Sequence, residues 1–305
     1  MKKLLVTGLT GFVGSSLMAW LEGEGRAAQL QPVGPTDELD LRDAAAVAQL
    51  VRSHAPDAVL HLAAQSHVGE SLADPAATLQ VNVVGTANLL KALTDQGFSG
   101  RMLYVSSADV YGAVPEDRLP VAETQPPAPR SPYGASKVAA EVLCQQWART
   151  YGLQVVIARP FNHTGPGQRP DFAPPGFARD AVAIARGLRP PQLPVGDLQV
   201  TRDFLDVRDV IDAYVRLLEK GVPGEIYNVC SGRELKLADL LADLLALAGA
   251  DAQIVPDPAR MRPAEQRRMC GDNRKLVAAT GWQPRHPLQD TLRQLIAYWH
   301  KELDT

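Results

Sequence analysis

In the first half of the chain, short apolar runs alternate with longer segments whose apolar positions follow a helical pattern. The short runs are typical of buried parallel strands, and the longer segments are typical of helices that cover a sheet. The expected strands are Lys3 to Thr7, Ala28 to Val33, Ala58 to Leu62, Arg101 to Val105 and Val155 to Arg159. The expected helices are Phe12 to Glu22, Ala44 to His54, Ala76 to Thr94 and Tyr133 to Thr150. This alternation predicts an α/β fold with a doubly wound parallel sheet.

The pattern becomes less regular after Pro160. Proline and glycine are dense from Pro166 to Pro194, which is typical of substrate-binding insertions. Helical patterns return later, and one apolar segment could add a strand to the sheet. These helices are Val210 to Lys220, Leu237 to Leu247 and Leu288 to Lys301, and the strand is Glu225 to Val229. We expect residues 1–160 to form the main domain, and 161–305 to form a smaller α/β portion with some segments that return to the sheet.

Composition narrows the classes of partner. The chain has 31 Lys and Arg against 34 Asp and Glu, a net charge of −3 without a block of like charge, so we expect neither nucleic acid nor an anionic membrane surface. No apolar run approaches the ~20 residues that span a bilayer, and no signal peptide is apparent, so we expect a cytoplasmic protein. Three cysteines without a CxxC pair predict neither a disulfide framework nor a metal site.

A glycine-rich segment, Thr7 to Gly14, follows the first expected strand and opens the first expected helix. This is the context of a dinucleotide-binding fingerprint. Gly8 and Gly11 would let the backbone approach a pyrophosphate at the helix N-terminus, and Gly14 would let helix and strand pack closely. The candidate cofactor contacts here are Gly8, Thr10, Gly11, Phe12, Val13 and Gly14. A glycine-rich turn without a ligand is the alternative interpretation.

The end of the second expected strand bears on the choice of cofactor. An acid there would bind the ribose 2′-hydroxyl of NAD, and an arginine would bind the 2′-phosphate of NADP, but residues 32–36 contain neither. We therefore expect NADP(H), with NAD(H) also accepted. Asp40 and Leu41 could line the adenine pocket, although Asp40 could equally be a surface-turn residue.

A tyrosine and a lysine stand four residues apart at the start of the fourth expected helix. This spacing puts Tyr133 and Lys137 on one helical face, where the ammonium would favour ionisation of a phenol whose ordinary pKa is about 10. Ser107 follows the strand that ends at Val105, at the carboxyl edge where open α/β sheets bind ligands. Ser107 could therefore hydrogen-bond a reacting carbonyl oxygen.

The TGxxGxxG segment, Ser107 and the YxxxK pair together resemble the extended short-chain dehydrogenase/reductase superfamily, over nearly the whole chain. Further motifs resemble the group of GDP-mannose 4,6-dehydratases and GDP-6-deoxy-4-keto-mannose reductases, and they are most similar to the reductases. These motifs are residues 61–68, 159–168, 202–204 and 257–265.

The resemblance implies a Rossmann sheet, catalytic roles for Ser107, Tyr133 and Lys137, and a GDP-sugar substrate. It implies cofactor contacts from Leu62, Ala63, Ala64, Tyr133 and Lys137. It implies substrate contacts from Ser107, Asn162, Arg179, Arg202, Arg262 and Glu265. Residues 1–160 would then bind the dinucleotide, and 161–305 mainly the sugar nucleotide.

Two chemistries fit such a substrate. A dehydratase needs a carboxylate to remove the C5 proton, and dehydratases of this group carry Glu two residues after the catalytic Ser or Thr. Asp109 stands there, one methylene shorter, and Ala108 cannot act as an acid. The sequence therefore favours NAD(P)H-dependent reduction of the C4 keto group of GDP-4-dehydro-6-deoxy-D-mannose to GDP-D-rhamnose or its C4 epimer. GDP-mannose 4,6-dehydration and a non-catalytic nucleotide-sensing role are the alternatives.

The YxxxK helix also suggests an assembly. In this superfamily that helix commonly packs against its symmetry mate, and here it offers apolar residues for two buried faces. These are Val138, Val142, Leu143 and Trp147. We expect a homodimer.

Overall fold

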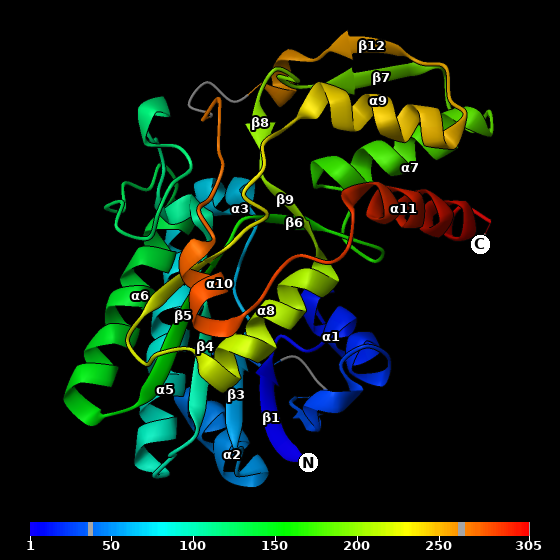
Figure 1. Cartoon of the computed structure of the whole chain (residues 1–305). Helices are drawn as coiled ribbons and strands as arrows, with labels where there is room; N and C mark the ends of the chain where they lie inside the picture. Colours follow the sequence, from blue (N-terminus) through cyan, green and yellow to red (C-terminus); the bar gives the residue numbers. More distant parts are fainter. Residues whose placement is uncertain (36–38, 262–265, 305) are drawn as a thin grey trace.

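The computed structural model describes residues 1–35, 39–261 and 266–304. Its central feature is a six-stranded sheet in the order β10-β5-β4-β3-β1-β2, and every neighbouring pair is parallel (Figure 1). The strands are β1 (Lys2–Thr7), β2 (Leu30–Val33), β3 (Ala58–His61), β4 (Arg101–Val105), β5 (Gln154–Pro160) and β10 (Ile226–Val229). This confirms the predicted Rossmann architecture, and β10 is the late segment that returns to the sheet.

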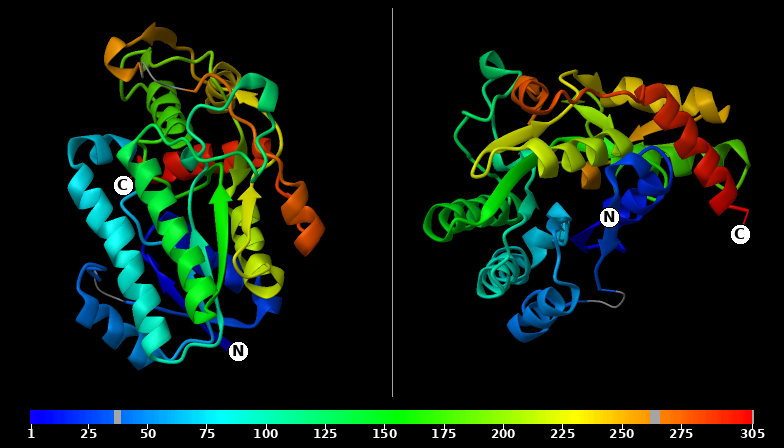
Figure 2. Two further views of the ribbon diagram at one scale, coloured as in Figure 1. Left: turned by 90° about the vertical axis from the view of Figure 1, so that its left-hand side faces the viewer. Right: turned by 60° about the horizontal axis from the view of Figure 1, so that its bottom comes forward.

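Helices cover both faces of the sheet. One face packs against α2 (Ala44–His54), α5 (Gly85–Asp95) and α6 (Pro132–Tyr151), with a core that includes Leu89, Leu93 and Cys144. The other face packs against α1 (Phe12–Glu22) and α8 (Val207–Lys220), with a core that includes Leu17 and Leu217. Figure 2 shows α5 and α6 side by side on their face of the sheet.

Two predictions in the first half were wrong in detail. The sequence predicted one helix from Ala76 to Thr94, but α4 (Pro75–Leu79) and α5 are separated by a π-helical turn, Gln80–Val84. The hydroxyl of Thr86 donates to the carbonyl oxygen of Asn82 at 2.6 Å, a back-bond that competes with the regular ladder. The second strand starts at Leu30 rather than Ala28, because Arg26–Ala28 form a 3₁₀ turn.

The smaller portion lies beyond the carboxyl ends of the sheet strands (Figure 1). Its core joins α7 (Ala173–Ala185), α9 (Leu237–Ala248) and α11 (Leu288–Glu302). Three two-stranded sheets accompany them: β6–β9 and β7–β12 are parallel, and β8–β11 is antiparallel. The remaining bounds are α3 (Val68–Ala73), β6 (Asn162–Thr164), β7 (Gln192–Val195), β8 (Thr201–Arg202), β9 (Phe204–Asp206), β11 (Leu235–Lys236), β12 (Gln253–Pro256) and α10 (Arg274–Thr280).

Helix α7 lies within the proline- and glycine-dense stretch 166–194, where the sequence pattern predicted no helix. Pro174 and Pro175 lie in its first turn, where the missing N–H groups have no intrahelical partner to lose. The proline-rich sequence therefore starts a helix instead of breaking one. Within the described ranges, none of the helices is long and apolar enough to cross a membrane.

Candidate active site

The dinucleotide loop, residues 7–14, joins β1 to α1 at the carboxyl edge of the sheet. Gly8 has φ +78°, and a Cβ there would lie 2.9 Å from the Ala63 nitrogen. A Cβ at Gly14 would lie 2.4 Å from the carbonyl oxygens of Gly8 and Leu9. Gly8 and Gly14, two of the three glycines of the fingerprint, are therefore positions that only glycine fits.

The first turn of α1 is open to an anion. Gly11 is its N-cap and supplies no side-chain hydrogen bond, and no acidic residue lies in the first turn. The first N–H groups of a helix have no intrahelical partner, and together with the helix dipole they attract phosphate. This loop fits the pyrophosphate of a dinucleotide, and the exposed Thr10 and Gly11 lie at its surface.

The other expected cofactor contacts lie on neighbouring segments. Leu62, Ala63 and Ala64 follow β3 directly and are half-buried beside Gly8. Asp40 is exposed, and its carboxylate accepts three hydrogen bonds from the Arg42 guanidinium at 2.8–3.1 Å, which lower its pKa. Leu41 is buried against Gly85 at the start of α5. Asp40 therefore carries a paired charge in an exposed turn, while Leu41 belongs to the core.

Ser107, Tyr133 and Lys137 meet at the carboxyl end of β4. Helix α6 begins at Pro132 because Ser131 caps it, accepting a hydrogen bond from the Gly134 nitrogen at 3.0 Å. The Lys137 ammonium donates to the Val105 carbonyl oxygen at 2.8 Å and lies 5.9 Å from the centroid of the Tyr133 ring. Ser107 follows Val105 closely and hydrogen-bonds the Tyr133 phenol. The structure thus brings the three residues together at one place.

Burial governs the protonation of this trio. Burial, and then the charge of Asp109, raise the pKa of Tyr133 above its ordinary value, while the hydrogen bond with Ser107 lowers it. Burial lowers the pKa of Lys137 to about 8, against the influence of Cys144 and Glu141. Near neutral pH the phenol therefore holds its proton and the ammonium is mainly charged, an arrangement suited to donating a proton to a substrate oxygen. This corrects the expectation that the Lys137 ammonium would favour the ionised phenol, because burial dominates the pKa of Tyr133.

Sequence reasoning missed Asn82, which lies in the π-helical turn and is 2% exposed. Its amide nitrogen donates to Ser136 Oγ at 2.9 Å and to the Gln65 carbonyl oxygen at 3.0 Å. Ser136 lies on α6 between the tyrosine and the lysine of the trio. A polar residue inside the apolar stretch from Val81 to Val84 was the available signal. Short π-helical turns are frequent at functional sites.

The candidate substrate residues come from three segments. Asn162 is exposed at the start of β6, which pairs with β9 in the register Asn162 to Phe204 and so lies near Arg202. Arg202 donates to the carbonyl oxygens of Thr201 at 2.7 Å and Gln266 at 2.8 Å. Arg179, on α7, pairs with its neighbour Asp180 at 2.8 Å. Arg262 and Glu265 lie outside the described residues.

A fully buried carboxylate, also missed from the sequence, supports the Arg202 segment. Asp203 accepts hydrogen bonds from the backbone nitrogens of Ser231, Gly232 and Gly271 at 2.7–3.2 Å, and from Ser231 Oγ at 2.6 Å. Burial raises its pKa in spite of these bonds. Asp203 therefore ties β8 and β9 to the segments that follow β10 and precede α10.

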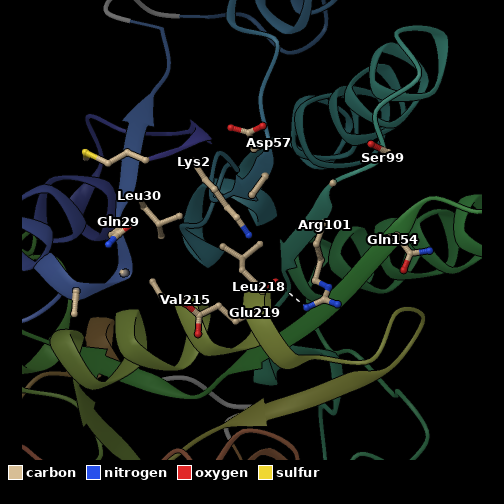
Figure 3. Close-up of a pocket in the computed structure, with 15 residues that line it drawn as sticks. Lys2, Gln29, Leu30, Asp57, Ser99, Arg101, Gln154, Val215, Leu218 and Glu219 are labelled. Carbon is tan, nitrogen blue, oxygen red and sulfur yellow. Dashed lines mark hydrogen bonds between the residues drawn. The ribbon is translucent and has the colours of Figure 1, made fainter.

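An open hollow of about 780 Å³ lies at the opposite edge of the sheet. Figure 3 shows Lys2, Asp57 and Arg101 around it, with the Arg101 guanidinium donating to the Leu218 carbonyl oxygen at 2.8 Å. These residues lie at the amino ends of β1, β3 and β4. The hollow is therefore separated from the Ser107 site by the length of the strands.

The chain is similar to known proteins over nearly its whole length. The chain is 48% identical over 302 residues to GDP-6-deoxy-D-mannose reductase of Pseudomonas aeruginosa, covering 99% of this chain and 98% of that protein. A solved structure of RMD from the same organism, complexed with NADPH, superimposes with a TM-score of 0.94 and 46% identity, covering 99% of this chain and 100% of that chain.

A dTDP-glucose 4,6-dehydratase of Escherichia coli strain K12 is 31% identical, over 97% of this chain and 92% of that protein. The family model described as GDP-mannose 4,6 dehydratase matches residues 35–295. These residues make up most of the chain. The protein therefore belongs to the GDP-mannose 4,6 dehydratase family, a group of Rossmann-fold enzymes related to the short-chain dehydrogenases and reductases.

Proposed function

We propose that this protein is an NAD(P)H-dependent oxidoreductase that reduces the C4 keto group of GDP-4-dehydro-6-deoxy-D-mannose, forming GDP-D-rhamnose. The observation that carries the proposal is the complete Ser107, Tyr133 and Lys137 site in a chain 48% identical, end to end, to a GDP-6-deoxy-D-mannose reductase. Fold alone would not assign an activity, whereas the site supplies the groups that carbonyl reduction needs.

The proposed chemistry needs one hydride and one proton. The reduced nicotinamide supplies the hydride when it is bound, and the dinucleotide loop with residues 62–64 would hold that cofactor. Negative charge then develops on the C4 oxygen, where Ser107 donates a hydrogen bond and Tyr133 donates the proton. Lys137, whose ammonium donates to the Val105 carbonyl oxygen, would orient the nicotinamide ribose of the bound cofactor.

We propose NADPH as the preferred reductant, with NADH also accepted. The described end of β2 reads Pro32, Val33, Gly34 and Pro35, which offers no carboxylate to repel a 2′-phosphate. The P. aeruginosa relative was solved with NADPH, which supports the same choice. A thousandfold preference for NADH in initial rates would contradict this proposal.

The reduction is favoured over 4,6-dehydration by the groups around the trio. Dehydration would require a base for the C5 proton and an acid for the C6 hydroxyl. Asp109 is exposed two residues after Ser107, on a shorter arm than glutamate, and its neighbour Ala108 is apolar and buried. A misplacement of about 1 Å can cost roughly 100-fold in rate, so this arrangement disfavours efficient dehydration.

The stoichiometry of cofactor consumption tests the proposal. With GDP-4-dehydro-6-deoxy-D-mannose, one NADPH should be oxidised per sugar, and the product should be identified by NMR as the D-rhamnose or the 6-deoxy-D-talose form. With GDP-mannose and NADP⁺ alone, little conversion should occur. Rapid formation of the 4-keto sugar under the second condition would instead establish the dehydratase. Binding of NADPH and of the 4-keto sugar nucleotide without turnover would establish a nucleotide-sensing protein.

We also propose a cytoplasmic homodimer built on α6. Val142 is exposed on this helix, and Leu79 and Val84 are exposed on the neighbouring α4 and π-helical turn. Burying these side chains against a second copy would stabilise the assembly. Light scattering at micromolar concentration should give the mass of a dimer, and Val142→Glu should shift it toward the monomer. A monomeric mass for the unmodified protein would contradict the proposal.

A further inference from the structure

A continuous set of buried polar side chains connects the dinucleotide loop to α6. Its members come from five different parts of the fold: β1, β3, the π-helical turn, α5 and α6. They are Thr7, His61, Thr86, Asn82 and Ser136, and each is at most 2% exposed. None of them takes part in the proton transfer proposed above. Burying so many polar groups is unfavourable unless every one is hydrogen-bonded, so their arrangement is closely specified.

The donors and acceptors in this set follow from the single hydroxyl proton of Thr86. Thr86 donates that proton to the Asn82 carbonyl oxygen at 2.6 Å, so Thr86 Oγ1 can only accept from His61 Nε2, which lies 3.1 Å away. Burial, and then the charge of Lys137, lower the pKa of His61 to about 3, so the ring is neutral. A neutral ring with its proton on Nε2 accepts at Nδ1, and Thr7 Oγ1 therefore donates to it at 2.6 Å.

The two ends of this set reach the two halves of the active site. Thr7 Oγ1 accepts a hydrogen bond from the Ala63 nitrogen at 3.3 Å, in the segment that packs against Gly8. At the other end, Asn82 donates to Ser136 Oγ, and Ser136 Oγ donates to the Tyr133 carbonyl oxygen at 2.7 Å. His61 also packs against the ring of Tyr104, over which the Lys137 ammonium lies.

We propose that His61 is a positioning residue that sets the register between the cofactor-binding backbone and the helix that carries the proton donor. Nδ1 holds the cofactor side through Thr7, and Nε2 holds the donor side through Thr86. The inference rests on the proposed reductase function. Its distinctive consequence is that each ring hydrogen bond governs a different property of the enzyme. Loss of the bond to Thr86 should lower kcat, and loss of the bond from Thr7 should weaken NADPH binding.

Two substitutions of His61 test the hydrogen bonds of its two ring nitrogens one at a time. The amide oxygen of His61→Asn can occupy the Nδ1 position and keep the bond from Thr7, but nothing reaches Thr86. The amide nitrogen of His61→Gln can occupy the Nε2 position and keep the bond to Thr86, but nothing accepts from Thr7. We expect H61N to lower kcat by roughly 10- to 100-fold with NADPH affinity retained, because the donor helix shifts. We expect H61Q to weaken NADPH binding by roughly 10-fold and to lower kcat less than H61N does.

NADPH dissociation constants, measured by nicotinamide fluorescence, and steady-state kcat are compared for both variants. Thr280→Val is the matched control, since it removes another buried hydroxyl, bonded to the Leu276 carbonyl oxygen far from the site. It should lower the melting temperature and leave both constants unchanged. If a His61 variant does not fold, Thr7→Val breaks the same bond as H61Q, and Thr86→Val breaks the same bond as H61N. Thr7→Val should then weaken NADPH binding, and Thr86→Val should lower kcat.

Identical losses in both variants, or lowered stability with unchanged constants as in Thr280→Val, would overturn the role of His61. The turnover of the unmodified protein distinguishes failure of the His61 proposal from failure of the proposed reductase function. If the unmodified protein oxidises no NADPH with the 4-keto sugar nucleotide, the reductase proposal fails. The NADPH affinities then still decide the inference, because unchanged affinity in H61Q and T7V would overturn it.

Discussion

At the scale of single residues, the phenol of Tyr133 is the group on which the proposed chemistry depends most. Burial and the charge of Asp109 raise its pKa, so it stays protonated through the neutral range and can act as an acid. Tyr133→Phe removes that proton and should lower kcat by ~100-fold or more with little change in NADPH affinity. Tyr227→Phe, which loses a buried hydroxyl outside the site, is the control. Turnover near that of the unmodified protein in Y133F would refute the assignment.

A second residue-scale prediction concerns Asp109. Its carboxylate is one methylene shorter than the glutamate that a dehydratase places there. Asp109→Glu should therefore raise the slow conversion of GDP-mannose to its 4-keto sugar with NADP⁺, because the longer side chain brings a base closer to C5. Asp109→Asn has no base and is the matched control. Equal rates for both variants, measured by product analysis, would show that this position does not limit dehydration.

At the scale of elements, the close approach of α1 to the end of β1 creates the dinucleotide loop. A Cβ at Gly14 would meet two backbone oxygens, which cannot move aside as a flexible side chain could. Gly14→Ala should push α1 away and weaken NADPH binding by roughly 10-fold or more, as measured by fluorescence titration. Gly23→Ala lies at the other end of α1, where a Cβ would meet only the Ala19 and Trp20 oxygens at 3.7–3.9 Å. Gly23→Ala should bind NADPH normally, and a normal affinity in G14A would contradict the prediction.

At the scale of the whole molecule, His286 connects the segment before α11 to two elements of the Rossmann domain. Its Nδ1 lies 2.7 Å from the buried Asp209 carboxylate on α8, and its Nε2 lies 3.1 Å from Glu24 after α1. Burial lowers the pKa of His286, but the hydrogen bond and charge of Asp209 outweigh burial and raise it above the ordinary value. Arg208 opposes this effect. The charged imidazole can donate to both carboxylates at once, which the neutral ring cannot.

This contact predicts a pH dependence of stability. Because the pKa of His286 is raised on folding, its contribution is complete below the unfolded pKa of about 6.5 and is lost as pH rises through the folded value. Urea unfolding should therefore show the stability difference between the unmodified protein and His286→Gln to be largest near pH 5.5 and smaller near pH 8.5. A difference that does not vary with pH would contradict the linkage.

The sequence alone determined much of this protein, because the decisive signals are local. Residues 12–22 and 44–54 were predicted with their observed bounds, since amphipathic spacing and buried strand runs depend on near neighbours. The dinucleotide loop was predicted from glycine spacing, and Tyr133 with Lys137 from one turn of helix. The strand end that carries Ser107 completed the trio, because parallel strands end at a common edge.

Only the tertiary structure decided how distant polar groups combine. The π-helical turn at Gln80–Val84 and the helix that begins at Ala173 depend on packing and on first-turn prolines, not on periodicity. Asp203 and His61 each bond groups dozens of residues away in sequence, so a linear pattern contains no sign of which partners they choose. Local chemistry, read from the sequence, thus identifies the reacting groups. Their relative placement is decided by the fold, because a buried polar side chain must find its partners wherever the chain brings them.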